Sequence, residues 1–186
     1  MAGNSRSADN GRALVLVGMT GAGKTSVGRE LARLLGRPWT DLDRELERRH
    51  GMSVARQFAR HGEQAFRRRE SALLRSLCRS PGRVLSTGGG VVLDPANRAL
   101  LRRHTVVYLK ASPAVLARRL RGAQARARPL LSGGDPAAVL RRMARQRAPL
   151  YRSCAGITVL AGVGESAAVA RRILQRLAAL RRPRAK

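Results

Sequence analysis

Cysteine and histidine are scarce in this chain of 186 residues, with two and three copies respectively. Cys78 and Cys154 lie far apart, in no spacing typical of a redox or metal site, so we expect two reduced, partly buried thiols. His50, His61 and His104 are equally scattered, which leaves no ligand set for zinc. The sequence therefore argues against a disulfide-stabilised scaffold and against a zinc enzyme.

Aromatic residues make up only 3% of the sequence, and no apolar run is long enough to span a bilayer. Stacking platforms for single-stranded nucleic acid therefore have almost no residues to form them. Residues 1–11 are polar and lack the apolar stretch of a signal peptide, and residues 183–186 form a short basic tail. We expect a cytoplasmic protein with a disordered leader at 1–11 and no membrane partner.

Acidic residues are also few: 11 stand against 38 basic residues, which gives a formal net charge of +27. Nearly all of the basic residues are arginine, since the only lysines are Lys24, Lys110 and Lys186. Such a field favours anionic partners, whether nucleotides, acidic metabolites or nucleic acid. No helix-turn-helix or RNA-binding motif accompanies the charge, so nucleic acid is not expected as a partner. The excess equally fits a general use of arginine in place of lysine.

Short apolar runs alternate with amphipathic segments along the chain. Strands are predicted at 13–17, 38–42, 83–87, 105–109 and 157–160, and helices at 25–35, 43–50, 53–60, 63–79, 95–103, 113–121, 136–151 and 165–180. This alternation indicates an α/β domain at 12–182, with helices on both faces of a five-stranded parallel sheet. Residues 122–135 have no clean period and are long for a simple connection, so they are interpreted as a mobile lid.

A complete G-x-x-x-x-G-K-T motif occupies residues 18–25, between the first predicted strand and the first predicted helix. In such a P-loop the backbone N–H groups surround phosphate oxygens, the lysine (Lys24) reaches the β- and γ-phosphates, and the hydroxyl of Thr25 ligates Mg²⁺. The residues expected to bind ATP here are Gly21, Ala22, Gly23, Lys24, Thr25 and Ser26. GTPases, ATPases and small-molecule kinases share this motif; with no guanine-reading motif and a short chain, a small kinase is favoured.

Five further motifs follow in order: Asp41-Leu42-Asp43, a G-E-x-x-F-R-x-x-E segment at 62–70, Gly88-Gly89-Gly90, R-P-L-L at 128–131, and R-x-P-x-Y at 147–151. Together with the P-loop, this set resembles the shikimate kinase family, a branch of the nucleoside-monophosphate-kinase-like P-loop fold. The resemblance covers roughly residues 12–160. It implies a three-layer P-loop NTPase fold with a lid that closes over ATP and shikimate.

The resemblance also implies roles for the two acids and for two arginines. Asp41 would support the Mg²⁺ shell, and Asp43 would hold the substrate hydroxyls and accept a proton during transfer. The same acids also suit the N-terminus of a helix, which is the alternative reading. Arg67 and Arg147 would grip the shikimate carboxylate from opposite sides. Glu70 would orient Arg67, while Arg68 and Arg69 are assigned to the surface.

The glycine triplet and the lid complete the implied site. Gly88, Gly89 and Gly90 would bring backbone N–H groups close to the substrate, because no side chain intervenes. Arg128 would move onto the phosphates and offset charge during transfer, so it is a catalytic candidate that also binds ATP. Arg121 would stack on adenine. A residue after the last strand often contacts adenine in this family, but none in 161–165 is assigned that role.

The function expected from this resemblance is transfer of the γ-phosphate of ATP to the 3-hydroxyl of shikimate, a step of chorismate and aromatic amino acid biosynthesis. ATP, Mg²⁺ and shikimate are the expected ligands, and the protein is expected to act as a monomer. Other readings remain open at this point. These are a gluconate or other small-metabolite kinase on the same fold, a nucleic-acid-binding NTPase suggested by the charge, and an inactive paralogue used for binding.

Overall fold

The structure is a computed structural model that describes residues 12–80, 82–120, 136–161 and 165–181. The leader at 1–11, the lid at 122–135 and the tail at 183–186 were expected from the sequence and lie outside the described residues. None of the helices in the described ranges is long and apolar enough to cross a membrane.

A parallel sheet forms the centre of the molecule, as the alternating apolar runs predicted. Its strands are β1 (Leu14–Val17), β2 (Trp39–Asp41), β3 (Val84–Ser86), β4 (Thr105–Lys110) and β5 (Ile157–Leu160). They are arranged in the order β2-β3-β1-β4-β5, and every pairing is parallel. All four residues of β1, the central strand, are buried, which explains its uninterrupted apolar sequence.

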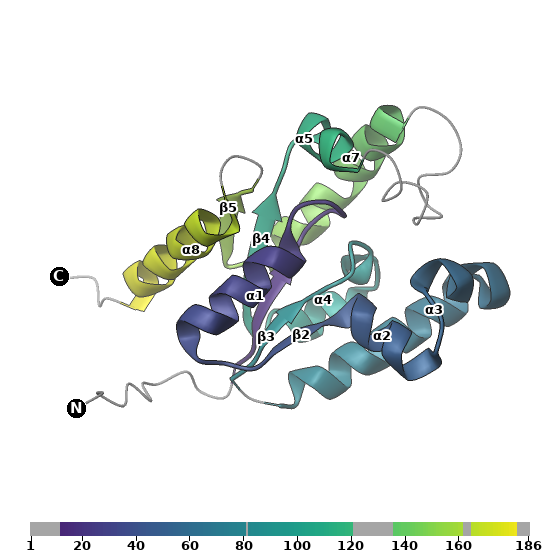
Figure 1. The fold of residues 1–186 in the computed structure, drawn as a ribbon, viewed down its shortest axis with the longest axis horizontal. Helices are drawn as coiled ribbons and strands as arrows, with labels where there is room; N and C mark the ends of the chain where they lie inside the picture. Colours follow the sequence, from purple (N-terminus) through teal and green to yellow (C-terminus); the bar gives the residue numbers. More distant parts are fainter. Residues whose placement is uncertain (1–11, 81, 121–135, 162–164, 182–186) are drawn as a thin grey trace.

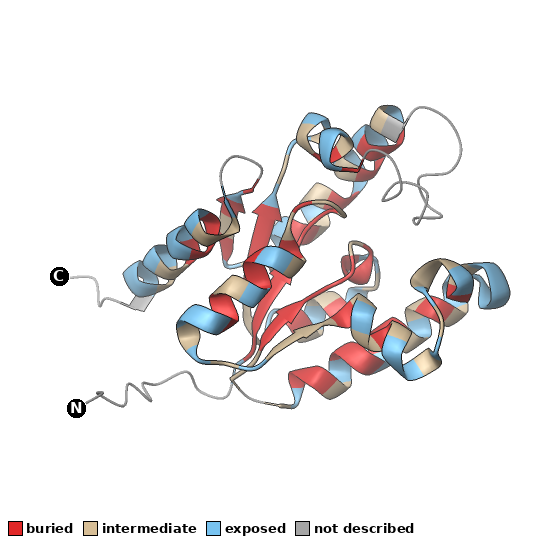
Figure 2. Cartoon of the chain, viewed as in Figure 1, coloured by how far each residue is buried: buried red, intermediate tan, exposed pale blue. Residues whose placement is uncertain are grey.

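Helices cover both faces of this sheet, so the fold has three layers (Figure 1). They are α1 (Lys24–Leu35), α2 (Leu42–His50), α3 (Val54–Cys78), α4 (Pro95–Leu101), α5 (Pro113–Arg119), α7 (Pro136–Cys154) and α8 (Ser166–Arg181), with a 3-10 turn η1 (Val91–Leu93). Helices α1 and α8 contact each other on one face, and α4 and α7 on the other. Buried residues concentrate in the strands and on the helix faces turned toward them (Figure 2).

One helix break agrees with the sequence prediction, and one helix end differs from it. Helix α3 spans both predicted helices, but Gly62 adopts φ 75° and ψ 165° within it. This non-helical backbone separates the two helices that were predicted at 53–60 and 63–79. Helix α7 continues through Pro149 to Cys154, although the sequence predicted an end at Tyr151. The η1 turn was not predicted, since three residues carry no periodicity.

The strand register aligns the chain segments that carry the motifs. Leu16 of β1 and Asp41 of β2 are both paired with Ser86 of β3. The carboxyl ends of the three strands therefore lie side by side at one edge of the sheet. Open parallel sheets bind ligands at this edge, so the loops that follow these strands are the place to look for a site.

Close packing of α1 onto the sheet depends on Gly28. A Cβ at this position would overlap Ser86 Oγ and would lie 2.8 Å from Trp39 Nε1. Those two groups bond to each other: Trp39 Nε1 donates to Ser86 Oγ at 3.1 Å, and Ser86 Oγ donates to the carbonyl of Lys24 at 2.8 Å. The absence of a side chain at Gly28 thus lets β2 and β3 hold the first turn of α1, which follows the P-loop.

We expect Gly28→Ala to destabilise the protein. Overpacking of this kind costs about 1–3 kcal/mol, and alanine recovers up to about 1 kcal/mol in helix propensity. A net loss of about 1 kcal/mol lowers Tm by about 2–4 °C in a chain of this length. Gly156→Ala is the matched control, because its Cβ would meet no atom within 4 Å. Thermal melting of both variants tests this, and a Gly28→Ala variant that melts at or above the wild type contradicts it.

Candidate active site

The P-loop follows β1 with backbone angles that favour glycine. Gly18, Gly21 and Gly23 have φ values of 146°, 78° and 92°. A side chain at Gly18 would also place a Cβ 2.6 Å from the carbonyl oxygen of Leu109. Helix α1 then begins at Lys24, with its N-terminus directed at the loop. The sequence motif therefore adopts the strand, turn and helix that phosphate binding requires.

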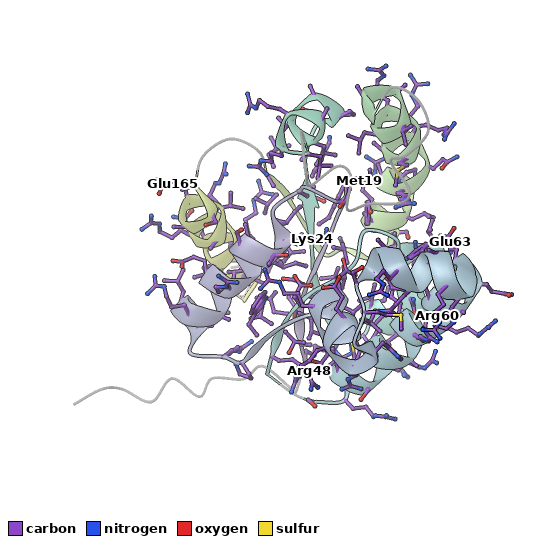
Figure 3. All side chains as sticks on the ribbon, turned by 45° about the vertical axis from the view of Figure 1, so that its right-hand side comes forward. Met19, Lys24, Arg48, Arg60, Glu63 and Glu165 are labelled. Atoms are coloured by element: carbon purple, nitrogen blue, oxygen red, sulfur yellow. The ribbon has the colours of Figure 1, made fainter. Side chains whose placement is uncertain are left out.

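A cavity of about 470 Å³ opens over this loop. Its lining includes all six residues predicted to bind ATP, namely Gly21, Ala22, Gly23, Lys24, Thr25 and Ser26. Lys24 is buried, and its Nζ donates to the carbonyl oxygens of Gly18 and Met19 at 2.9 Å each. Figure 3 shows Lys24 and Met19 near the centre of the molecule, at the P-loop. The ammonium group is thus held at the cavity by the loop itself.

Asp41 bonds to the P-loop and also caps helix α2. Its Oδ2 accepts a hydrogen bond of 2.6 Å from Thr25 Oγ1. Its Oδ1 accepts from the N–H groups of Asp43 and Arg44 at 3.1 and 3.3 Å, which caps the N-terminus of α2. The cap orients the carboxylate toward the P-loop. A carboxylate oxygen and a threonine hydroxyl side by side are hard ligands of the kind that Mg²⁺ prefers, so these residues fit such an ion.

Two carboxylates flank the glycine triplet after β3. A Cβ on Gly88 would lie 2.8 Å from Asp43 Oδ1 and 2.5 Å from Glu70 Oε1. Asp43 lines the cavity, whereas Glu70 is 1% exposed. Burial raises the pKa of Glu70, and the nearby Asp43 raises it further, while the guanidinium of Arg67 works against both. Only a glycine fits at position 88, because a side chain there would collide with both acids.

Arg67 points into the same region from α3. Its Nη1 donates to Glu70 Oε2 at 2.7 Å, and its Nη2 donates to Glu63 Oε1 at 3.1 Å. The guanidinium lies 5.6 and 5.4 Å from the ring centroids of Phe58 and Phe66. A Cβ at Gly90 would overlap this guanidinium. The orientation of Arg67 is therefore set by two acids, two rings and one glycine.

The neighbouring arginines face elsewhere, with one difference from the prediction. Arg68 is exposed, as the sequence suggested. Arg69 was also assigned to the surface, yet it is only half-exposed, and its Nη1 is buried with no hydrogen-bond partner among the described residues. Sequence alone does not show this, because a helix rotates successive side chains by 100° and the packing around α3 decides what covers each.

Arg147 approaches the glycine triplet from α7, opposite α3. Its side chain is buried, and its Nη1 donates to the carbonyl of Gly89 at 3.3 Å. Three buried polar atoms without a hydrogen-bond partner among the described residues lie around this turn: Thr20 Oγ1, Glu70 Oε1 and Arg147 Nε. Buried polar atoms are rarely left unpaired, so these three are notable around a turn that carries several of the predicted site residues.

The structure therefore brings most of the predicted site together. Asp43, Arg67 and Arg147 surround the triplet at 88–90, and Asp43 and Gly89 also line the cavity of the P-loop. The expected phosphate and substrate positions are thus contiguous. Arg121 and Arg128 lie outside the described residues, so the roles given to them remain predictions.

Other lining residues were missed by the sequence reasoning. Arg119 lines the cavity, and its Nη1 donates to the carbonyl of Gly21 at 3.2 Å. It belongs to a group of closely spaced arginines, and no motif distinguishes it from its neighbours. Ala161, Ser166 and Val169 line the cavity from the end of β5 and from α8, near the segment where no adenine contact was assigned.

A family model described as shikimate kinase matches residues 20–178. The chain belongs to the shikimate kinase family. Shikimate kinases of Nitrosomonas europaea and Aromatoleum aromaticum are 43% and 48% identical to it over 178 and 161 residues, which are 94% and 86% of this chain and 83% and 91% of those relatives. A solved structure of the family, shikimate kinase from Acinetobacter baumannii in complex with shikimate, superimposes with a TM-score of 0.89 at 38% identity and covers 94% of this chain and 97% of that one. The predicted family, the α/β class and the P-loop kinase fold are all confirmed.

Proposed function

We propose that this enzyme transfers the γ-phosphate of ATP to the 3-hydroxyl of shikimate, giving shikimate 3-phosphate and ADP. Family membership and the Acinetobacter baumannii relative in complex with shikimate support this acceptor. The observation that carries the proposal is the pair of arginines, Arg67 and Arg147, that contact the glycine triplet at 88–90 beside the P-loop. Two guanidinium groups suit a substrate with one carboxylate and several hydroxyls.

ATP would lie on the P-loop. The N–H groups of residues 21–26 and the N-terminus of α1 suit the phosphates, and Lys24 would exchange its two carbonyl partners for phosphate oxygens. Thr25 and Asp41 would hold Mg²⁺, which neutralises phosphate charge when bound. Arg128 from the lid would offset charge on the transferring group, and Arg121 would lie against adenine.

Shikimate would lie between α3 and α7. Arg67 and Arg147 would bind its carboxylate, and Glu70 would hold Arg67 in place. Asp43 would bind the ring hydroxyls, with the N–H groups of Gly88, Gly89 and Gly90 close by. Because Asp43 also lines the cavity of the P-loop, the hydroxyl that it holds faces the phosphates.

The reaction would then depend mainly on positioning. The 3-hydroxyl oxygen attacks the γ-phosphorus in line, the bond from that phosphorus to the bridging oxygen of ADP breaks, and Asp43 accepts the hydroxyl proton. Closure of the lid at 122–135 would exclude water, which would otherwise consume ATP. Each named group comes from one chain, so we propose a monomer, in the cytoplasm where ATP is available.

ADP release tests this function directly. Purified protein with ATP and Mg²⁺ is assayed in parallel with shikimate, gluconate and nucleoside monophosphates. We expect ADP to form rapidly with shikimate and only at the background rate with the other two. A response to gluconate alone, or ATP hydrolysis that no acceptor stimulates, contradicts the proposal.

A further inference from the structure

Two parts of the site meet at the hydroxyl group of Tyr151, on α7. The side chain of Tyr151 is fully buried, and its hydroxyl donates a hydrogen bond to the carbonyl oxygen of Gly89. The same hydroxyl lies 3.8 Å from Met19 Sδ, in the P-loop. Met19 in turn accepts a hydrogen bond from Lys24 through its carbonyl. Tyr151 is thus linked to the turn at residues 88–90, here called the acceptor turn, and to the P-loop at residues 18–25, here called the phosphate loop.

The Gly89 carbonyl is held from two positions on the same helix. Arg147, one turn before Tyr151, donates to this oxygen from Nη1 at 3.3 Å. The carbonyl of Gly89 and the N–H of Gly90 belong to one planar trans peptide group. When the oxygen is fixed, the direction of that N–H is fixed as well. The orientation of the turn toward the acceptor therefore depends on its hydrogen bonds to α7.

Gly89 also touches the P-loop through its backbone. A Cβ at this position would lie 3.1 Å from the N atom of Thr20 and 3.7 Å from the carbonyl oxygen of Gly18. The acceptor turn and the phosphate loop therefore pack without a side chain between them. A shift of the Gly89 peptide toward the loop would displace the loop as well.

The tyrosine ring is itself held in place, and the hydroxyl keeps its proton. The ring stacks on Tyr108 of β4, with centroids 5.0 Å apart and planes 25° apart. Burial raises the pKa of Tyr151, so the hydroxyl is a donor throughout the neutral range. Its position and its protonation state both suit a permanent hydrogen bond to Gly89.

We propose that Tyr151 is a positioning residue whose hydroxyl holds the Gly89 peptide in the orientation that receives the acceptor, and holds it against the phosphate loop at Met19. Tyr151 does not touch the reacting atoms in this arrangement. It acts through the glycine turn, which packs against the loop that binds phosphate. The identity of the acceptor as shikimate rests on the proposed function.

Tyr151→Phe removes the hydroxyl and keeps the ring. Loss of one neutral hydrogen bond to the turn is expected to raise the KM for shikimate by about 3–10-fold. The Kd of ATP measured without acceptor is expected to stay within about twofold, because the variant leaves Lys24 and the loop glycines in place. Tyr108→Phe is the matched control: its ring stacks on Tyr151, and its hydroxyl forms no hydrogen bond with any of the described residues. It is expected to leave both constants within about twofold.

Thermal melting reports folding, and the constants are measured where wild type and both variants are folded. An unchanged KM for shikimate in Tyr151→Phe, with or without a lower Tm, overturns the inference because the hydroxyl is then only structural. Equal losses for shikimate and ATP overturn it as well. Failure of the proposed function is distinguishable, because the wild type would then not turn over shikimate at all.

Discussion

Replacing Lys24 with methionine is expected to reduce turnover by about 10²–10³-fold, the effect of removing one preorganised charge from a transfer site. Methionine keeps the apolar stem, which is largely buried, but it cannot stabilise charge on the phosphates. It also loses the donor that binds the carbonyls of Gly18 and Met19. The measurement is kcat for ADP release at saturating ATP and shikimate, with thermal melting to verify the fold.

Lys110→Met is the matched control for this variant. Lys110 ends β4 and is exposed, so the control makes the same change of charge outside the cavity. We expect its kcat to stay within about twofold of the wild type, since surface substitutions rarely have larger effects. Near-normal turnover by Lys24→Met would show that the P-loop lysine does not serve phosphoryl transfer in this enzyme.

Replacing Arg67 with alanine is expected to raise the KM for shikimate by about 10²-fold, because truncating a partly buried charged partner costs about 2–5 kcal/mol. The KM for ATP is expected to change by less than about threefold, since Arg67 bonds to Glu63 and Glu70 and is not part of the cavity lining over the P-loop. Steady-state kinetics with each substrate varied in turn give both constants. Equal losses for the two substrates would count against Arg67 as a ligand of the shikimate carboxylate.

Arg67→Ala also leaves Glu70 buried without its guanidinium partner, which is destabilising in itself. Arg67→Lys keeps the positive charge but removes the planar guanidinium group. It therefore separates the loss of bidentate binding from the loss of charge. We expect its KM for shikimate to lie between those of the wild type and Arg67→Ala. Arg68→Ala, one residue further along α3 and exposed, is the control and is expected to behave as the wild type.

Much of the fold followed from local sequence, because the signals are local. The strand at 157–160 and the glycine-ended helix at 25–35 could be predicted from short apolar runs and from caps. The strand order β2-β3-β1-β4-β5 could not be predicted in this way, because it depends on which strands pair across the sheet. Helix α7 exceeded its predicted end because tertiary packing of Tyr151 and Cys154 keeps the last turn in place.

The site, too, could be predicted from the sequence only in part. The P-loop is evident from its motif, and the family resemblance predicts Asp43, Arg67 and Arg147 as site residues. Arg119 was not named, since its bond to Gly21 joins residues almost a hundred positions apart. Arg121 and Arg128 stay predictions, because the structure does not describe them.

By itself, the sequence showed the motif of a phosphate-binding loop, and its resemblance to a family predicted the acids, arginines and glycines of an acceptor site. These are matters of residue type and short spacing, which fix the available donors, charges and backbone freedom. Only the tertiary structure decided how they combine. It placed Asp43 and Glu70 together beside Gly88, and it joined Tyr151 to Gly89 and Met19, because the packing of helices and loops around the sheet brings together residues that are distant in the chain.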